Sequence, residues 1–276
     1  MTTRASTPES DRGFVGSLPS IYQSHLVPLI FEPYARDLAG RLAERRPLRV
    51  LEIAAGTGSV TRAMVAALPD SVFITATDLN QGMLDQAAAV GTARPVEWRK
   101  ADAMQLPFDD NAFDAVVCQF GVMFFPDRAK AFAESRRVLR PGGELLFSTW
   151  DRIQDNEFAD VVTDALAERY PADPPRFMAR TPHGYTEPAT ILADVAAGGF
   201  TFRPSLTTLA ERSRADSPET VAVAYCQGTP LRNEIEAREP GGLGPATEHA
   251  AQAIARRFGT GPVEGKIQAH VVVVEA

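Results

Sequence analysis

The sequence has few of the features that mark secreted, metal-binding or membrane-spanning proteins. Its only cysteines, Cys118 and Cys226, do not form the spaced set of a metal site or a disulfide framework. No apolar run approaches the ~18 residues of a membrane span. The opening segment, residues 1–13, is polar and lacks the apolar stretch of a secretory signal. We therefore expect a reduced, cytoplasmic protein without a membrane span.

The sequence also lacks an excess of positive charge. Its 28 Lys and Arg residues are outnumbered by 35 Asp and Glu residues, which gives a formal net charge of -7 at pH 7. Basic pairs such as Arg45-Arg46 and Arg256-Arg257 are scattered rather than gathered into one patch. Nucleic acid is therefore not an expected partner. The oligomeric state is left open, with a homodimer among the options.

What the sequence does contain is an alternation of buried strands and helices. Residues 48–54 are nearly all apolar, as in a parallel strand covered on both faces, and a helical spacing follows as far as Leu68. Later strands are expected at 71–78, 95–102, 113–121 and 144–150, with helices at 81–90 and 127–139 and a turn at 140–143. This order predicts an α/β, Rossmann-like fold with a mostly parallel sheet and helices on both faces.

The C-terminal part follows a different plan. Helices are expected at 156–169 and from Pro188 to the glycines at 198–199, and the last two strands are expected at 200–213 and 266–276. These two strands should form an antiparallel pair, which gives the sheet an antiparallel C-terminal strand. Two further helices, at 218–231 and 246–259, are inserted between them and exceed what a hairpin needs.

The segment "VLEIAAGTGSVT", Val50–Thr61, carries the strongest local signal. A buried strand ends in a turn with Gly56 and Gly58, and a helix begins directly afterwards. Backbone N–H groups at such a helix start can face a ligand, and glycine lets the ligand come close. Asp78 ends the next strand, where an acid can accept hydrogen bonds from both ribose hydroxyls. The sequence therefore predicts a nucleoside-containing ligand.

A nicotinamide dinucleotide fits this turn less well. The dinucleotide fingerprint has a third glycine, where this chain has Thr61. The first strand also carries an acid, Glu52, and the chain has no Tyr-x-x-x-Lys pair. An NAD(P)-dependent oxidoreductase therefore stays as an alternative and not as the leading hypothesis.

Four segments in order resemble the motifs of class I S-adenosylmethionine-dependent methyltransferases. They are "VLEIAAGTGSVT", "ATDLNQGML", "ADAMQLPFDDNAFDAVVCQFGVMFFPD" and "RVLRPGGELLFSTW", and they cover roughly Val50 to Trp150. The sequence is most similar to the methyltransferase type 11 group, near the ubiquinone and menaquinone C-methyltransferases. It departs from the family at Ala54, where glycine is common. The segment "CQFG" differs from the Asn/Asp-Pro-Pro-aromatic tetrad of amino-methylating DNA enzymes.

This resemblance implies S-adenosylmethionine as the cofactor, held by residues at the carboxyl ends of the strands. It places Glu52 toward the loop amides and the methionine end, and Ala54, Gly56 and Thr57 in the turn against the methionine part. It places Asp78 on the ribose, Leu79 beside the adenine, and Asp102 and Ala103 at the adenine edge. Gln119 and Phe120 would lie near the methionine carboxylate and the transferred methyl group.

The resemblance also implies methyl transfer to a small-molecule acceptor, by C-, O- or N-methylation. A non-catalytic S-adenosylmethionine binder is the second alternative. We expect a helical lid in residues 1–46, broken by Pro28 and Pro33, a cofactor-binding core in 47–150, and acceptor-pocket helices within 151–276. No catalytic base and no metal ligand is assigned. The candidate acceptor contacts are Tyr22, His183, Tyr185, Tyr225 and Gln227.

Overall fold

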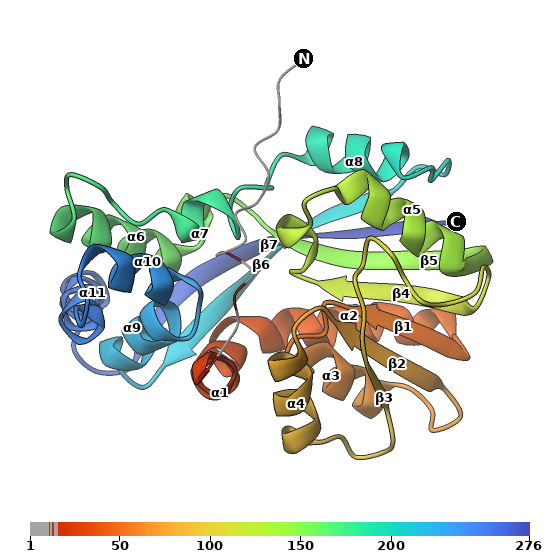
Figure 1. Ribbon diagram of the computed structural model, residues 1–276, viewed down its shortest axis with the longest axis horizontal. Helices are drawn as coiled ribbons and strands as arrows, with labels where there is room; N and C mark the ends of the chain where they lie inside the picture. Colours follow the sequence, from red (N-terminus) through yellow and green to blue (C-terminus); the bar gives the residue numbers. More distant parts are fainter. Residues whose placement is uncertain (1–10, 12, 14–15) are drawn as a thin grey trace.

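The computed structural model describes Asp11, Gly13 and residues 16–276; the other residues of the expected lid, 1–10, 12 and 14–15, lie outside the described residues. Seven strands form one sheet in the order β3-β2-β1-β4-β5-β7-β6 (Figure 1). The strands are β1 (Arg49–Ile53), β2 (Phe73–Asp78), β3 (Glu97–Lys100), β4 (Phe113–Gln119), β5 (Leu139–Trp150), β6 (Ser205–Ala215) and β7 (Val263–Glu275).

The pairing directions agree with the expected fold class. The strands β1 to β5 pair in parallel, whereas β7 lies antiparallel between β5 and β6. The β6–β7 pair runs from Ser205 opposite Val273 to Ala215 opposite Val263, so it is the expected antiparallel pair. The Rossmann-like sheet with antiparallel C-terminal strands is therefore confirmed.

Side chains alternate between two buried layers along the central strands, because successive residues of a strand point to opposite faces. On β4, Val116 and Cys118 join one apolar cluster, whereas Ala115 and Val117 join the other. The first cluster includes residues of α5 (Arg128–Val138) and α8 (Pro188–Ala197). The second includes residues of α2 (Glu32–Arg45) and α3 (Ser59–Ala67). The central strands are therefore covered on both faces, which explains their almost wholly apolar sequences.

Two helix ends in the core follow the sequence signals. The side chain of Asp127 accepts a hydrogen bond from the Lys130 backbone N–H at 3.0 Å and so caps α5, as predicted. The helix α4 (Gln81–Val90) ends at Gly91, which adopts a φ of 78°. Both helices occupy the residues that the sequence predicts to within one position.

A group of helices lies at one end of the molecule, around the extended ends of β6 and β7 (Figure 1). Its members are α6 (Glu157–Arg169), α7 (Phe177–Arg180), α9 (Pro218–Gln227), α10 (Leu231–Arg238) and α11 (Leu243–Phe258). The helices α9 and α11 were expected between the last two strands, but α10 was not. Its only large buried side chains are Leu231 and Ile235, too few to give a clear helical period.

Residues 18–45 are helical throughout, so the expected breaks at Pro28 and Pro33 are wrong. This segment consists of α1 (Leu18–Ile21), a π-helix η2 (Tyr22–Phe31) and α2. Pro33 lies in the first turn of α2, where a missing backbone N–H costs no helical hydrogen bond. Pro28 lies inside η2. The backbone hydrogen bonds of this π-helix join residues five positions apart, whereas those of an α-helix join residues four positions apart.

The turn expected at residues 140–143 is also not a separate element, since these residues fall within β5. Phe113 pairs with Leu139 but Ala115 pairs with Glu144, so β5 bulges against β4 at this point. Gly142 adopts a φ of 76°, which the bulge requires. The Ala276 backbone N–H donates to the Gly143 carbonyl at 2.9 Å, so the strand end closes over the bulge.

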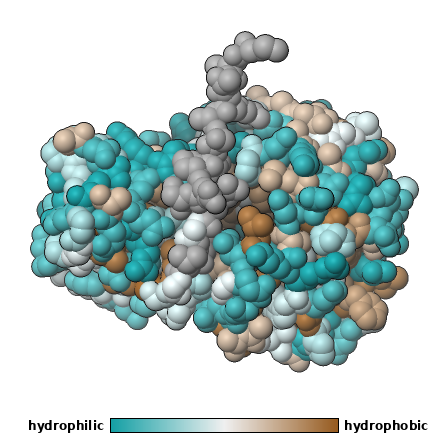
Figure 2. All heavy atoms as spheres, in the orientation of Figure 1, coloured by the Kyte–Doolittle hydropathy of each residue, from teal (hydrophilic) through white to brown (hydrophobic). Residues whose placement is uncertain are grey.

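The surface in Figure 2 is mainly hydrophilic, with hydrophobic residues scattered among the polar ones. Within the part of the chain that the structure describes, no helix combines the length and the apolar character needed to cross a membrane. Two short 3₁₀-helices, η3 (Val122–Phe124) and η4 (Ile153–Asp155), follow β4 and β5. The segment that contains η3 contributes directly to the site.

Candidate functional site

A cavity lies where the strand order reverses. The chain runs from β1 outward to β3 and then returns to β4 on the other side of β1, and ligands of open α/β sheets bind at such a point, beyond the carboxyl ends of the strands. We call this the first cavity. Of the residues predicted to bind the cofactor, those that line it are Ala54, Gly56, Asp78, Leu79, Asp102, Ala103, Gln119 and Phe120.

Asp78 forms the polar centre of the first cavity. One carboxylate oxygen accepts from the Gly56 backbone N–H and the other from the Asn80 backbone N–H, each at 2.8 Å. Burial raises the pKa of the Asp78 carboxyl, although these backbone hydrogen bonds oppose the rise. Each carboxylate oxygen has a second lone pair, so the side chain can still accept hydrogen bonds from two hydroxyl groups.

Gln119 and Asp102 add further hydrogen-bond acceptors to the cavity. Among the described residues, the buried Oε1 of Gln119 has no hydrogen-bond partner, while its Nε2 donates to the Phe31 carbonyl at 3.4 Å. Asp102 holds its own loop by accepting from the Met104 backbone N–H at 2.8 Å. A set of acceptors suits a ligand with hydroxyl, amino and ammonium donors. The residues present therefore fit S-adenosylmethionine, and Leu79, Met83 and Met104 supply apolar surface for an adenine ring.

The two glycines of the turn face different surroundings. A Cβ on Gly56 would lie 3.6 Å from the Met83 Cε and 3.9 Å from the Tyr22 hydroxyl, both of which line the cavity. A Cβ on Gly58 would lie 2.8 Å from the Trp98 ring, below the distances that real contacts show. Both glycines have positive φ angles. Gly56 thus faces the ligand space, whereas Gly58 allows close packing against β3.

Backbone strain is concentrated beside this turn. Ala54 and Phe120, which follow the neighbouring strands β1 and β4, have φ angles of 55° and 51°. A left-handed conformation costs a non-glycine residue about 1–2 kcal/mol. This conformation would suit glycine at position 54, because glycine adopts positive φ without steric cost. Strained residues of this kind cluster at binding sites, where the surrounding structure holds them in place.

Two predicted cofactor residues, Glu52 and Thr57, do not line the first cavity. Glu52 accepts a hydrogen bond from the Thr61 hydroxyl at 2.5 Å, so its carboxyl is turned toward the start of α3. The structure therefore directs the Glu52 carboxyl to Thr61, and its expected role at the methionine end of the cofactor stays a prediction. Burial raises the pKa of Glu52 to about 8, although its hydrogen bond to Thr61 lowers it. Thr57 is also buried, and its carbonyl accepts from Arg62 at 2.7 Å.

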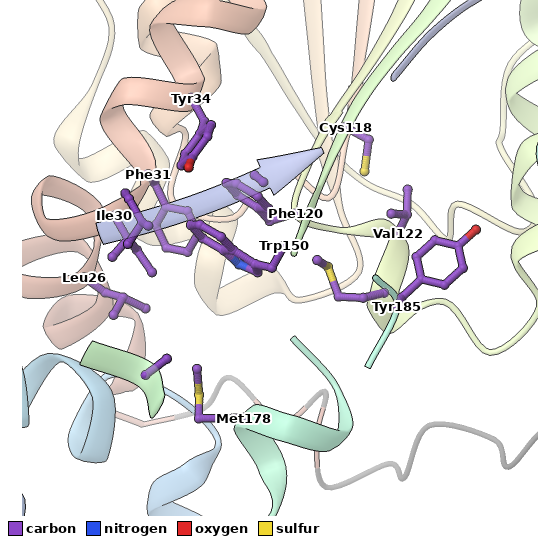
Figure 3. Packing of buried hydrophobic residues seen from close by; sticks show 14 of the residues in the cluster. Leu26, Ile30, Phe31, Tyr34, Cys118, Phe120, Val122, Trp150, Met178 and Tyr185 are labelled. Carbon is purple, nitrogen blue, oxygen red and sulfur yellow. The ribbon is translucent and has the colours of Figure 1, made fainter. Parts of the chain in front are cut away.

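A second, more apolar cavity adjoins the first. Its walls come from η2, from the ends of β4 and β5, and from the helical group at the end of the sheet (Figure 3). The lining residues are Tyr22, Leu26, Ile30, Phe31, Phe120, Phe124, Trp150, Phe177, Met178, Pro182, Tyr225, Thr229 and Pro230. Tyr22, Phe120 and Phe124 line both cavities and therefore form the wall that the two share.

The predicted acceptor contacts divide into two groups. Tyr22 and Tyr225 line the second cavity, whereas Gln227, His183 and Tyr185 line neither of the two cavities. The Gln227 side-chain amide donates to the Thr247 hydroxyl of α11 at 3.2 Å. Gln227 therefore packs between helices instead of reaching the cavity.

His183 and Tyr185 lie behind the cavity wall. The His183 Nδ1 is 2.8 Å from the Asp151 carbonyl, and burial lowers the pKa of its imidazole to about 4. The ring of Tyr185 packs under the Arg128 guanidinium, 4.2 Å from the ring centroid. In Figure 3 the Tyr185 hydroxyl points away from the pair formed by Phe120 and Trp150. The loop at residues 181–188 therefore contributes Pro182 to the second cavity, whereas His183 and Tyr185 support the wall from behind.

Several lining residues were missed by the sequence reasoning. Met83, Phe124 and Phe125 lie inside the quoted motif segments, so their signal was present but their role was not recognised. Phe177 and Met178 follow a proline-rich stretch without a clear period, and only tertiary structure brings them to the cavity. Among the described residues, no group of His, Cys, Asp and Glu side chains is arranged to hold a metal ion.

Comparison with known proteins identifies the family of the chain. A family model described as a methyltransferase domain matches residues 51–147. The demethylmenaquinone methyltransferase of Thermus thermophilus is 33% identical over 187 residues, which make up 63% of this chain and 82% of that protein. A ubiquinone/menaquinone biosynthesis C-methyltransferase of Teredinibacter turnerae is 37% identical over 39% of this chain. That match spans only 45% of the relative, so the chain covers about half of the length of some curated relatives.

The fold is shared with more distant proteins. The crystal structure of the [4+2]-cyclase SpnF superimposes with a TM-score of 0.57 at 19% sequence identity, covering 99% of each chain. At this identity the likeness establishes the fold alone. The Thermus enzyme and the family model both relate the chain to methyltransferases. The cavity at the strand reversal, which is lined by hydrogen-bond acceptors, fits the cofactor of this family. The chain belongs to the class I methyltransferases, and its cofactor is S-adenosylmethionine.

Proposed function

We propose that this methyltransferase acts on a small, largely apolar acceptor with a flat, electron-rich ring, bound in the second cavity. The observation that carries the proposal is the shared wall: Tyr22, Phe120 and Phe124 border the cofactor cavity on one side and the apolar cavity on the other. A group transferred between ligands in the two cavities would pass between these side chains. Aromatic walls suit a planar apolar ligand.

Each cofactor residue has a proposed task. We assign the ribose hydroxyls to Asp78, the adenine to Leu79, Asp102 and Ala103, and the amino-acid end to Gln119 together with the Ala54–Gly56 turn. We assign Glu52 and Thr57 to support of the turn, since Glu52 holds the start of α3 and the Thr57 carbonyl is held by Arg62. The eight predicted residues that line the first cavity support these assignments.

Methyl transfer from S-adenosylmethionine requires that the acceptor atom be positioned against the methyl group, and it does not require a catalytic triad. When bound, S-adenosylmethionine supplies a methyl group that is already activated for displacement. Phe120, Tyr22 and Phe124 would align the acceptor atom with that group and exclude water, and orientation of this kind can account for ~7–11 kcal/mol of a barrier. Burial raises the pKa of Tyr22 and of Tyr225, so neither phenol is suited to remove a proton at neutral pH.

The names of two relatives point to a quinone-type acceptor, and one of these names specifies carbon as the methylated atom. One is called a demethylmenaquinone methyltransferase and the other a ubiquinone/menaquinone biosynthesis C-methyltransferase. A quinol is flat, apolar and electron-rich, so it matches the walls of the second cavity. We therefore propose C-methylation of a quinol-like ring.

The proposed division of the chain is supported by the cavity walls. Residues 47–150 line most of the cofactor cavity, whereas η2 and residues after 150 close the acceptor cavity. Both cysteines are buried free thiols, which supports a reducing compartment such as the cytoplasm. The N-terminal helices from α1 to α2 serve as the lid in this proposal.

Two measurements test the function. A calorimetric titration should show binding of S-adenosylhomocysteine and none of NAD. Release of S-adenosylhomocysteine from S-adenosylmethionine should then be followed with 1,4-naphthohydroquinone, with a simple phenol and with an aliphatic amine. We expect turnover with the hydroquinone first. Binding of NAD alone would contradict the cofactor, and turnover of the amine alone would contradict the acceptor class.

A further inference from the structure

Arg62 joins the glycine turn to the N-terminal helical segment. It lies in α3, and its Nη1 donates to the Thr57 carbonyl within the turn at 2.7 Å. Its Nη2 donates to the Gln23 side-chain carbonyl, on η2, at 3.0 Å. One rigid, planar guanidinium therefore spans two segments that are far apart in the sequence. Neither Arg62 nor Gln23 is among the residues that line the two cavities.

The segment that Gln23 belongs to forms walls of both cavities. Tyr22 lines both, and its hydroxyl lies 3.9 Å from the position of a Cβ on Gly56. Leu26, Ile30 and Phe31 line the second cavity alone. A shift of η2 relative to the glycine turn would therefore change the shape of the acceptor cavity. It would also move Tyr22 within the cofactor cavity.

The two ends of η2 are held by different partners. Near its C-terminal end, the Leu29 carbonyl accepts from the Ser213 hydroxyl of β6 at 2.8 Å. Near its N-terminal end, Gln23 is held by Arg62. The segment is π-helical and contains Pro28, which has no N–H to donate to the helix. π-Helical segments are uncommon and often lie at functional sites. The first turn of η2 is therefore bonded to α1 through the Tyr22 backbone N–H and, outside the helix, to Arg62 through the Gln23 side chain.

We propose that Arg62 is a positioning residue that couples the two ligands through Gln23. Occupation of the first cavity fixes the glycine turn, the turn fixes the Arg62 guanidinium, and Arg62 fixes the first turn of η2. The acceptor cavity is then complete only when the cofactor is in place. Because coupling is reciprocal, an acceptor should also strengthen cofactor binding. This inference rests on the proposed function of the two cavities.

The test uses the full-length protein and S-adenosylhomocysteine as the probe. Hydrogen–deuterium exchange is measured for peptides that cover residues 22–31, with and without the probe, and calorimetry gives its affinity. The variants are Gln23→Ala, which removes the acceptor of the Arg62 bond, and Gln23→Glu, which keeps a carbonyl-type acceptor. The matched control is Ser24→Ala, since Ser24 is the exposed neighbour and bonds to the Ser20 carbonyl within the same helical segment.

In the wild-type protein and in Ser24→Ala, the probe should slow exchange across residues 22–31. In Gln23→Ala the probe should bind within about threefold of the wild-type affinity but should lose most of this protection, and Gln23→Glu should recover it. With an active acceptor, Gln23→Ala should raise the acceptor KM more than it lowers kcat.

The possible outcomes separate the inference from the function on which it rests. Full protection in Gln23→Ala would overturn the coupling role. A loss of probe affinity beyond about tenfold, equivalent to about 1.4 kcal/mol, would also overturn it, because Gln23 would then belong to the cofactor site itself. No binding of the probe to the wild-type protein would instead contradict the proposed function. Arg62→Lys, which keeps the charge but not the two-pronged geometry, should behave like Gln23→Ala.

Discussion

Phe120 and Trp150 stack face to face, with ring centroids 3.8 Å apart and an interplanar angle of 1°. Phe120 follows β4 and Trp150 ends β5, so the stack joins two neighbouring strands at the edge of the site. The left-handed backbone of Phe120 directs its ring into this position. Tyr34 meets both rings edge-on, at 5.2 and 5.4 Å. Aromatic packing therefore holds the Phe120 side of the wall that the two cavities share.

The first prediction concerns Asp78. Replacement by Ala removes the proposed acceptor of the ribose hydroxyls, and each such bond is worth about 1.5–3 kcal/mol. The affinity for S-adenosylhomocysteine, measured by calorimetry, should fall at least tenfold. Asp85→Ala is the matched control, because Asp85 is an exposed acid on α4 outside the first cavity. Equal affinity of folded Asp78→Ala and wild-type protein would remove Asp78 from the cofactor site.

The second prediction separates the two glycines of the turn. Gly56→Ala places a methyl group toward the ligand space, with its nearest neighbours 3.6 Å away or more, so it should weaken cofactor binding more than stability. Gly58→Ala places the methyl group 2.8 Å from the Trp98 ring, so it should lower the melting temperature more than Gly56→Ala does. Both replacements carry the left-handed penalty of about 1–2 kcal/mol. Thermal unfolding and calorimetry on the same samples check the order, which a larger stability loss in Gly56→Ala would contradict.

The sequence was sufficient to predict many of the residues that line the first cavity, because these residues follow the strands of the sheet closely in the sequence. The strands β1 and β4 are short and mostly apolar, so the sequence shows where each one ends. The residues that line the first cavity, such as Ala54 and Phe120, come directly after these ends. Asp78 and Asp102 could be placed together because parallel strands bring their carboxyl ends to one edge of the sheet. Glu52 was less predictable, since the strand pattern fixes which face a side chain is on but not which hydrogen bond it makes.

The acceptor side was harder to predict because its walls are assembled from distant segments. Tyr225 and Gln227 are neighbours on α9, yet Tyr225 lines the cavity and Gln227 turns toward α11. On a helix, a step of two residues changes the facing direction by more than half a turn, so a pair of this kind cannot share one wall. Met178 could not be predicted from the sequence, because it lies on a four-residue helix that is too short to show a helical spacing of apolar residues.

The third prediction concerns the pH dependence of stability. Burial raises the pKa of Glu52 to about 8 from an ordinary 4.5, so the folded protein binds a proton there that the unfolded chain releases. The associated stability is fully present below about pH 4.5 and is lost as the pH rises through about 8. Glu52→Gln cannot ionise and keeps an oxygen that can accept from Thr61. Its stability relative to the wild-type protein should therefore increase between pH 5 and pH 8, by an amount on the order of a few kcal/mol. Denaturant unfolding at several pH values measures this difference, and parallel curves for the two proteins would mean that Glu52 is ionised in the folded state.

The last prediction concerns the two neighbours on α9. Tyr225 is buried and lines the acceptor cavity, so Tyr225→Leu should alter the contact with the acceptor while filling much of the same space. We expect the acceptor KM to rise about tenfold, which corresponds to about 1.4 kcal/mol of binding free energy. The affinity for S-adenosylhomocysteine should stay within about twofold of the wild-type value, because Tyr225 does not line the first cavity.

Gln227→Ala serves as the control: it removes a hydrogen bond to Thr247 between two helices and should lower the melting temperature slightly while leaving the acceptor KM unchanged. The two titrations, cofactor and acceptor, are made on each variant. An acceptor KM that changes in Gln227→Ala but not in Tyr225→Leu would show that the acceptor does not occupy the second cavity.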